Sequence, residues 1–109
     1  MPAPDAADHV FRTLADPTRR RILDLLAERG VLNVSQLAAE FPDLAVSGIS
    51  KHLMALRAAG LVSARRRGRQ RFYRLNAQAM AETLAPWLAK YEPYWSAALE
   101  RLKNLAEGR

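Results

Sequence analysis

The part of this chain that most constrains its fold is a helical pattern between Ser47 and Gly60. Three apolar residues recur three or four positions apart and predict one buried stripe: Ile49, Leu53 and Leu56. Four further residues share a different face of the same helix: Ser47, Ser50, Lys51 and Met54. Gly60 is typical of the position just past a helix C-terminus. The sequence therefore predicts a helix that buries one side and presents a small, mostly polar side to solvent.

The residues that follow predict a β-hairpin rich in arginine. Residues 61–67 form the outgoing strand, Gly68 and its neighbours form the turn, and residues 71–75 form the returning strand. A helix with a small polar face followed directly by such a hairpin is the arrangement of a winged helix-turn-helix. The fold class we expect is therefore mainly α with a small β-hairpin.

Positive charge is concentrated in the same stretch. Residues 47–75 contain eight basic side chains and no acidic one, whereas residues 1–46 carry a net charge of −2 and residues 76–109 are neutral. The whole surplus of +6 therefore lies in the predicted helix and hairpin. A concentrated positive patch is expected of a protein that binds nucleic acid. The alternative is a basic face that is merely solvated, but the patch coincides with an element shaped to dock on DNA.

Length and composition limit the remaining possibilities. A chain of 109 residues, half of them hydrophobic, is expected to fold as one domain. The absence of cysteine excludes disulfides, thiolate metal sites and thiol redox sensing. No apolar run approaches the ~20 residues needed to span a bilayer, so we expect no membrane partner. Since the N-terminus also lacks an export signal, we expect a cytoplasmic protein.

Three helices are predicted before residue 47. Residues 1–4 resemble a frayed leader, and Asp5 can cap a first helix. The apolar stripe of this helix consists of Ala7, Val10, Phe11 and Leu14. Asp16 and Pro17 predict the start of a second helix that ends at Gly30. Ser35 is expected to cap a short third helix, whose inward residues are Val34, Leu37, Ala38 and Phe41.

Three consecutive arginines occupy the first turn of the second predicted helix. Cations oppose the helix dipole there, which suggests that Arg19 and Arg20 contact phosphate. The alternative is that Arg21 pairs with Asp24 while Arg19 and Arg20 are simply solvated. The sequence favours neither.

The last third of the chain combines an apolar stripe with a cluster of aromatic residues. Asn76 is expected to cap a helix over residues 76–109, which Pro86 restarts or kinks. We interpret this segment, which follows a helical core and wing of residues 5–75, as a dimerisation helix that packs against its symmetry mate. The expected dimer interface comprises Val10, Phe11, Trp87, Leu88, Tyr91, Trp95, Leu99 and Leu102. The alternative is that the aromatic residues fold back onto their own domain.

Several linked motifs resemble the ArsR/SmtB family of winged-helix repressors. They are LADPTRRRILDLL at 14–26, VSQL at 34–37, ISKHL at 49–53, LRAAGLV at 56–62 and YRL at 73–75. The resemblance covers residues 10–75 without a break, and the aromatic last helix is similar to that of cysteine-free autorepressor members. It implies a homodimeric transcriptional repressor whose first and last helices form the dimer interface.

The predicted helix and hairpin supply the candidate DNA contacts, and three of them, Ser47, Ser50 and Lys51, match contact positions of the family. Candidates on the recognition helix are Val46, Ser47, Ser50, Lys51, His52 and Arg57. Candidates on the wing are Arg65, Arg66, Arg67, Arg69, Gln70 and Arg71. This chain has Ala45 and Val46 where the family commonly has a Ser-Gln-like pair, so Val46 can touch a thymine methyl group but cannot hydrogen-bond to a base.

The residues that sense metals in relatives are replaced here. Asn33 and Ser35 stand at the place of a Cys-x-Cys-like motif, and both histidines, His9 and His52, lie outside the last helix. We therefore expect no metal site and no cofactor; the sequence identifies no small-molecule effector.

An enzyme is disfavoured because Ser50 and His52, two positions apart on a helix, do not face each other. The function we expect is a homodimeric repressor that occupies a palindromic operator in double-stranded DNA. Alternatives are a low-specificity architectural DNA-binding protein and a protein-interaction module that uses the aromatic helix.

Overall fold

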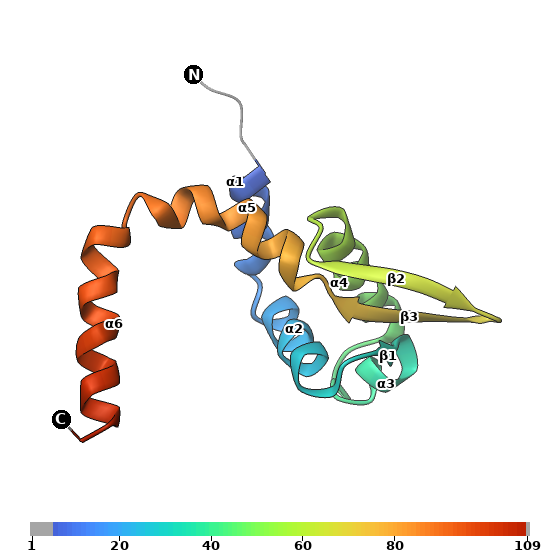
Figure 1. The fold of residues 1–109 in the computed structure, drawn as a ribbon. Coiled ribbons are helices and arrows are strands. Elements are labelled where there is room, and N and C mark those ends of the chain that lie inside the picture. The colour runs from blue at the N-terminus through green and yellow to red at the C-terminus, as the bar shows by residue number, and fades with distance from the viewer. Residues whose placement is uncertain (1–5, 109) are drawn as a thin grey trace.

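The computed structural model describes residues 6–108 and contains six helices and three strands in that range (Figure 1). The expected leader and the Asp5 cap lie outside the described residues. In chain order the elements are α1 (Ala6–Leu14), α2 (Pro17–Arg29), β1 (Leu32–Asn33), α3 (Val34–Ala38), α4 (Val46–Ala58), β2 (Val62–Arg67), β3 (Gln70–Leu75), α5 (Ala77–Ala89) and α6 (Glu92–Ala106). The predicted mainly α fold with a small β-hairpin is confirmed.

The core forms where α2, α3 and α4 pack against the base of the sheet. The apolar stripe predicted for α4 is fully buried there, as are Ile22 of α2 and Leu37 of α3. Burial of each such side chain contributes about 1.5–3 kcal/mol. Because this stripe fixes the rotation of α4 about its axis, the opposite, mostly polar side of the helix faces solvent.

The sheet has three antiparallel strands in the order β1-β3-β2. The hairpin of β2 and β3 is as predicted, with Val62 opposite Leu75 at its base and Arg67 opposite Gln70 at its tip. Gly68 has φ +64° in the two-residue turn, a conformation that L side chains rarely adopt. The strand β1 was not predicted, since two residues are too few to show an alternating pattern. It pairs with β3 through Leu32 and Tyr73.

Capping side chains determine where α2 and α3 begin. Asp16 caps α2 as predicted, its Oδ1 accepting hydrogen bonds from the backbone N–H groups of Thr18 (2.8 Å) and Arg19 (3.2 Å). The predicted Ser35 cap of α3 is wrong, because the helix begins at Val34, two residues earlier than that cap implies. Asn33 caps it instead, in a reciprocal pair of 2.8 Å hydrogen bonds with Gln36 that satisfies both backbone N–H groups.

The C-terminal segment forms two helices, but the break between them does not lie at Pro86, where a restart or kink was predicted. Pro86 lies inside α5 without ending it, whereas Pro93 lies in the first turn of α6. Pro93 has no N–H to donate to the carbonyl of Ala89, so the α-helical ladder cannot continue across this point. The chain therefore turns at Lys90 and Tyr91, and α6 stands apart from the body of the molecule, at the far end of α5 (Figure 1).

This arrangement gives the chain an extended shape. Its radius of gyration is 16.9 Å and its principal extents are 50 × 45 × 26 Å. A compact domain of this length has a radius of gyration of about 13 Å. No helix within residues 6–108 has the length and apolar character needed to cross a membrane.

Candidate nucleic-acid interface

The N-terminal half of α4 projects the predicted recognition residues from the core. The helix starts after Ala45, whose side chain makes no capping hydrogen bond. Val46 is 57% exposed, Ser47 and Lys51 are exposed, and Ser50 is half-buried. The buried stripe on the other side of α4 holds these residues on the outer surface of the domain.

A groove separates α4 from the wing and brings the two sets of predicted contacts together. It has a volume of about 280 Å³ and is lined by Val34, Ser50, Met54, Arg66, Arg69, Gln70, Arg71 and Tyr73. Arg66 and Arg71 face each other across the hairpin, and Arg66 Nε donates to the carbonyl of Gly68 at 3.3 Å. The structure thus places a serine of α4 in one groove with three wing arginines.

Three groove residues are missing from the predicted DNA contacts: Val34, Met54 and Tyr73, of which Met54 alone is exposed. Met54 is 64% exposed and lines the groove beside Ser50, one helical turn away. Its place on the polar face was visible in the sequence, but methionine is more often a core residue. A flexible apolar side chain at this position can contact a thymine methyl group.

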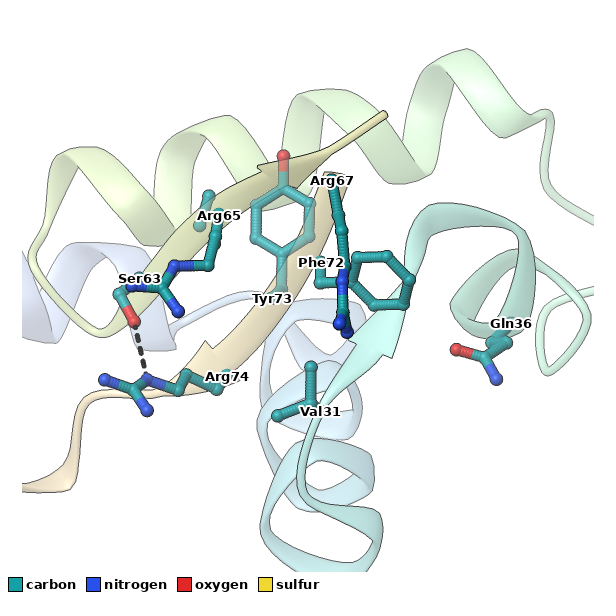
Figure 2. Close-up of a pocket in the computed structure, with 9 residues that line it drawn as sticks. Val31, Gln36, Ser63, Arg65, Arg67, Phe72, Tyr73 and Arg74 are labelled. Carbon is teal, nitrogen blue, oxygen red and sulfur yellow. Dashed lines mark hydrogen bonds between the residues drawn. The ribbon is translucent and has the colours of Figure 1, made fainter. Parts of the chain in front are cut away.

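The wing residues divide between the two faces of the hairpin. Successive side chains of a strand point to opposite faces, so Arg65 and Arg67 lie on the face away from Arg66. Figure 2 shows Arg65 and Arg67 beside Phe72 and Arg74 on that outer face. The six predicted wing contacts therefore do not share one surface.

The arginines at the start of α2 have partners within the protein. Arg19 Nε donates to His52 Nδ1 at 3.2 Å, which links the first turn of α2 to α4. Arg20 Nη1 donates to the carbonyl of Leu14 at 2.6 Å. Arg21 forms an ion pair with Glu28, with 3.8 Å between Nη1 and Oε1. The predicted pair of Arg21 with Asp24 is therefore wrong. His52 is turned toward α2, away from Ser50.

The carboxylate of Asp16 lies beside this link and is stabilised in its charged form. Burial is the largest single effect and by itself would raise its pKa, but it is outweighed by the hydrogen bonds from the N–H groups of Arg19 and Thr18 together with nearby charges. The nearby His52 and Arg19 side chains act in the same direction, so the pKa of Asp16 lies below its usual value.

A second surface is formed by exposed apolar side chains of α1, α5 and α6. We define the apolar strip as Phe11, Trp87, Leu88, Tyr91, Trp95, Leu99 and Leu102, each of which is 37–61% exposed. Val10 was expected in this interface, but it is 1% exposed and belongs to the core of the single chain. Its position one residue before Phe11 turns it to the inner side of α1.

Aromatic contacts order the part of the strip nearest the body. The rings of Phe11 and Trp87 meet edge to face at 4.9 Å, and those of Trp87 and Tyr91 lie 5.0 Å apart. Trp95 Nε1 donates to the carbonyl of Leu88 at 3.2 Å across the turn between α5 and α6. The aromatic residues thus fold back onto α1 in part, while α6 has no buried residue.

The described residues contain no cluster of side chains that could bind a metal ion. Within residues 6–108, no three His, Asp or Glu side chains come together at metal-binding distance. The absence of a metal site stays a prediction.

Comparison with known proteins agrees with this architecture. A family described as a helix-turn-helix domain matches residues 14–64. The chain is 33% identical over 84 residues to the transcriptional repressor SdpR of Bacillus subtilis (strain 168), covering 77% of this chain and 90% of SdpR.

Two solved structures are similar in both sequence and fold. The ArsR-like transcriptional regulator from Rhodococcus sp. RHA1 shares 35% identity and a TM-score of 0.70, over 95% of this chain and 93% of that one. The homodimeric winged helix-turn-helix DNA-binding domain Mb0332 from Mycobacterium bovis, a possible ArsR-family regulator, shares 28% identity and a TM-score of 0.63, over 86% and 93%. The motifs, the fold and these relatives together show that the chain belongs to the ArsR family of winged helix-turn-helix transcriptional regulators.

Proposed function

We propose that this regulator is a cytoplasmic homodimeric repressor that occupies a roughly palindromic operator and thereby blocks transcription. The groove between α4 and the wing carries the proposal, because Ser50 lies there together with Arg66, Arg69 and Arg71. A polar side chain that can reach a base edge thus lies beside cations that can neutralise phosphates. Repression is also supported by the similarity to SdpR, which is named a transcriptional repressor.

The proposed DNA contacts fall into two classes. Val46, Ser47, Ser50 and Met54 would approach base edges in the major groove, with Val46 and Met54 touching thymine methyl groups. The cationic residues Arg19, Arg20, Lys51, Arg57, Arg66, Arg69 and Arg71 would contact phosphates, with His52 and Gln70 beside them. Contact of Arg65 and Arg67 with DNA stays a prediction, and these two residues lie on the outer face of the wing.

Dimerisation is supported by the apolar strip. Seven large apolar side chains stay at least one third exposed on α1, α5 and α6. Contiguous exposed apolar surface of this kind marks an interaction site, and a second copy of the same surface is the simplest partner. The homodimeric state of the Mb0332 domain agrees with this assignment.

Selection of bound sequences from a random pool of duplex DNA tests the proposed function directly. A repressor is expected to enrich one motif with two inverted half-sites. Enrichment of no motif, with DNA still bound, would favour the low-specificity architectural alternative. Failure to bind any DNA at moderate salt would favour a protein-interaction module.

A further inference from the structure

A second pocket lies on the outer face of the wing, opposite the groove that faces α4. Its volume is about 570 Å³, within the range of small-molecule sites. Val31 and Gln36 border it on the side of β1 and α3, and β2 and β3 form its floor (Figure 2). The side chains on that floor are Ser63, Arg65, Arg67, Phe72 and Arg74, which share the outer face of the hairpin.

The pocket contains three arginines and no carboxylate. Arg65 lies directly opposite Phe72 in the ladder, with Arg67 and Arg74 as its neighbours on the same face. Like charges so close on one face of a sheet repel each other. Within residues 6–108, Arg65 and Arg67 form no ion pair with an acidic side chain. An anion bound among the three guanidinium groups would relieve this repulsion.

The hydrogen bonds of Arg74 leave most of its donors available. Its Nε donates to Ser63 Oγ at 3.4 Å, which orients the guanidinium group toward the same space as that of Arg65 (Figure 2). Its two terminal nitrogens donate no hydrogen bond within the described part of the chain. A planar guanidinium group with free terminal N–H groups matches the geometry of a carboxylate.

Apart from Ser63 and Gln36, the remaining lining is largely apolar. The half-buried ring of Phe72 stands between the arginines and α3, and Val31 is 54% exposed across from it. Figure 2 shows the Arg67 side chain running alongside Phe72 toward Val31. An aromatic ring could therefore stack on Phe72 and on a guanidinium plane while its acid group meets Arg65 and Arg74.

We propose that this pocket, which we name the wing pocket, binds a small aromatic carboxylate. The carboxylate is held by Arg65 and Arg74, and the ring lies between Phe72, Val31 and Arg67. The arginines of the two cavities lie on opposite faces of the hairpin, with Arg65, Arg67 and Arg74 on the outer face and Arg66 and Arg71 on the face toward α4. Tyr73 lines both cavities. The proposal does not rest on the proposed operator binding, since the ligand would bind the free protein.

Titration of the DNA-free protein with 2-naphthoate tests the wing pocket. Binding is followed by the fluorescence anisotropy of the naphthoate and by the NMR signals of Val31 and Phe72. We expect saturable binding that shifts both residues and weakens as salt is added. The neutral analogue 2-naphthalenemethanol and the non-aromatic anion acetate should each bind at least about tenfold more weakly, because each lacks one of the two interactions.

Two variants of β3 test whether naphthoate binds on the outer face of the wing. Arg74→Ala removes an exposed guanidinium group from the wing pocket and should weaken naphthoate binding about tenfold or more. Arg71→Ala removes the same charge from the opposite face of β3 and should leave naphthoate binding within about twofold, since at 0.15 M ionic strength the Debye length is about 8 Å. Equal losses in the two variants, no shift at Val31 and Phe72, or equal binding of the neutral analogue would each overturn the proposal.

Discussion

Side chains in the α4 groove differ in the kind of DNA contact they can make. Arg69, in the hairpin turn, is exposed, and no acidic side chain within residues 6–108 forms an ion pair with it. Ser50 is half-buried on the rigid surface of α4 and has a single short hydroxyl group. A flexible cation suits phosphate, whereas a hydroxyl held by a helix suits a base edge.

The replacements Arg69→Ala and Ser50→Ala should therefore have different thermodynamic signatures. Loss of a phosphate contact reduces counterion release, so Arg69→Ala should weaken binding to all DNA and lower the salt slope by about 1 per half-site. Ser50→Ala should reduce the preference for operator over scrambled DNA by about 1–3 kcal/mol per base pair read. Binding to both DNAs across a salt series measures the two effects. An unchanged slope for Arg69→Ala would remove the hairpin turn from the DNA interface.

Asp16 should make the stability of the domain depend on pH. Its carboxylate caps α2, and removal of such a cap by Asp16→Ala costs about 1 kcal/mol near neutral pH. Because the folded pKa lies below the ordinary value of 3.8, this stability is present above that value and is lost as the pH falls through the folded pKa. Urea unfolding of both proteins at pH 7 and at pH 3 measures the difference.

Asp24→Ala is the matched control for Asp16→Ala. Asp24 is exposed on the same helix and forms no ion pair within residues 6–108, so the control removes the same charge without removing a cap. A difference between wild type and Asp16→Ala that stays constant as the pH falls would contradict the capping role of the charged carboxylate.

At the level of elements, the wing depends on the backbone of its turn. Gly68 has φ +64°, and a Cβ added there would meet no atom within 4 Å. The cost of a side chain at this position is therefore backbone strain alone, about 1–2 kcal/mol. Gly68→Val should destabilise the protein by about this amount, while Gly48→Ala, at a helical glycine that also has no atom within 4 Å of an added Cβ, should cost nothing, since the backbone there is ordinary α-helix. Thermal unfolding measures both, and equal losses would contradict the strain argument.

Some elements could be predicted from the sequence and others could not, depending on whether they rely on residues close together in the chain. The apolar stripe of α4, the cap at Asp16 and the hairpin around Gly68 were predictable because each depends on residues close in the chain. The strand β1 was not, since Leu32 becomes a strand residue only by pairing with Tyr73, forty-one positions later. The division of the wing into two faces follows from alternation, but the wing pocket also needs Val31 and Gln36, which only the folded chain places beside the hairpin.

The C-terminal half of the apolar strip determines the assembly of the whole molecule. The helix α6 extends from the body, has no buried residue and exposes Leu99 and Leu102 by 52% and 61%. A charge at Leu102 would be buried without a partner in the proposed dimer, so Leu102→Glu should convert dimer to monomer at micromolar concentration. The control Asn104→Glu adds the same charge at an exposed polar position of α6. Sedimentation velocity measures both, and a dimeric Leu102→Glu protein would place the interface elsewhere.

The spacing of half-sites in the operator tests the dimer and the groove together. A two-fold dimer places its two copies of α4 in successive major grooves, about 34 Å or 10 base pairs apart. Insertion of five base pairs between the half-sites rotates one of them by about half a turn, to the far side of the duplex. A rigid wild-type dimer can then engage only one half-site, so its affinity should fall to that for an isolated half-site. The Leu102→Glu protein, as a monomer, should bind both spacings equally. If the wild-type protein tolerates the insertion, its two copies of α4 are not held in fixed register by the apolar strip.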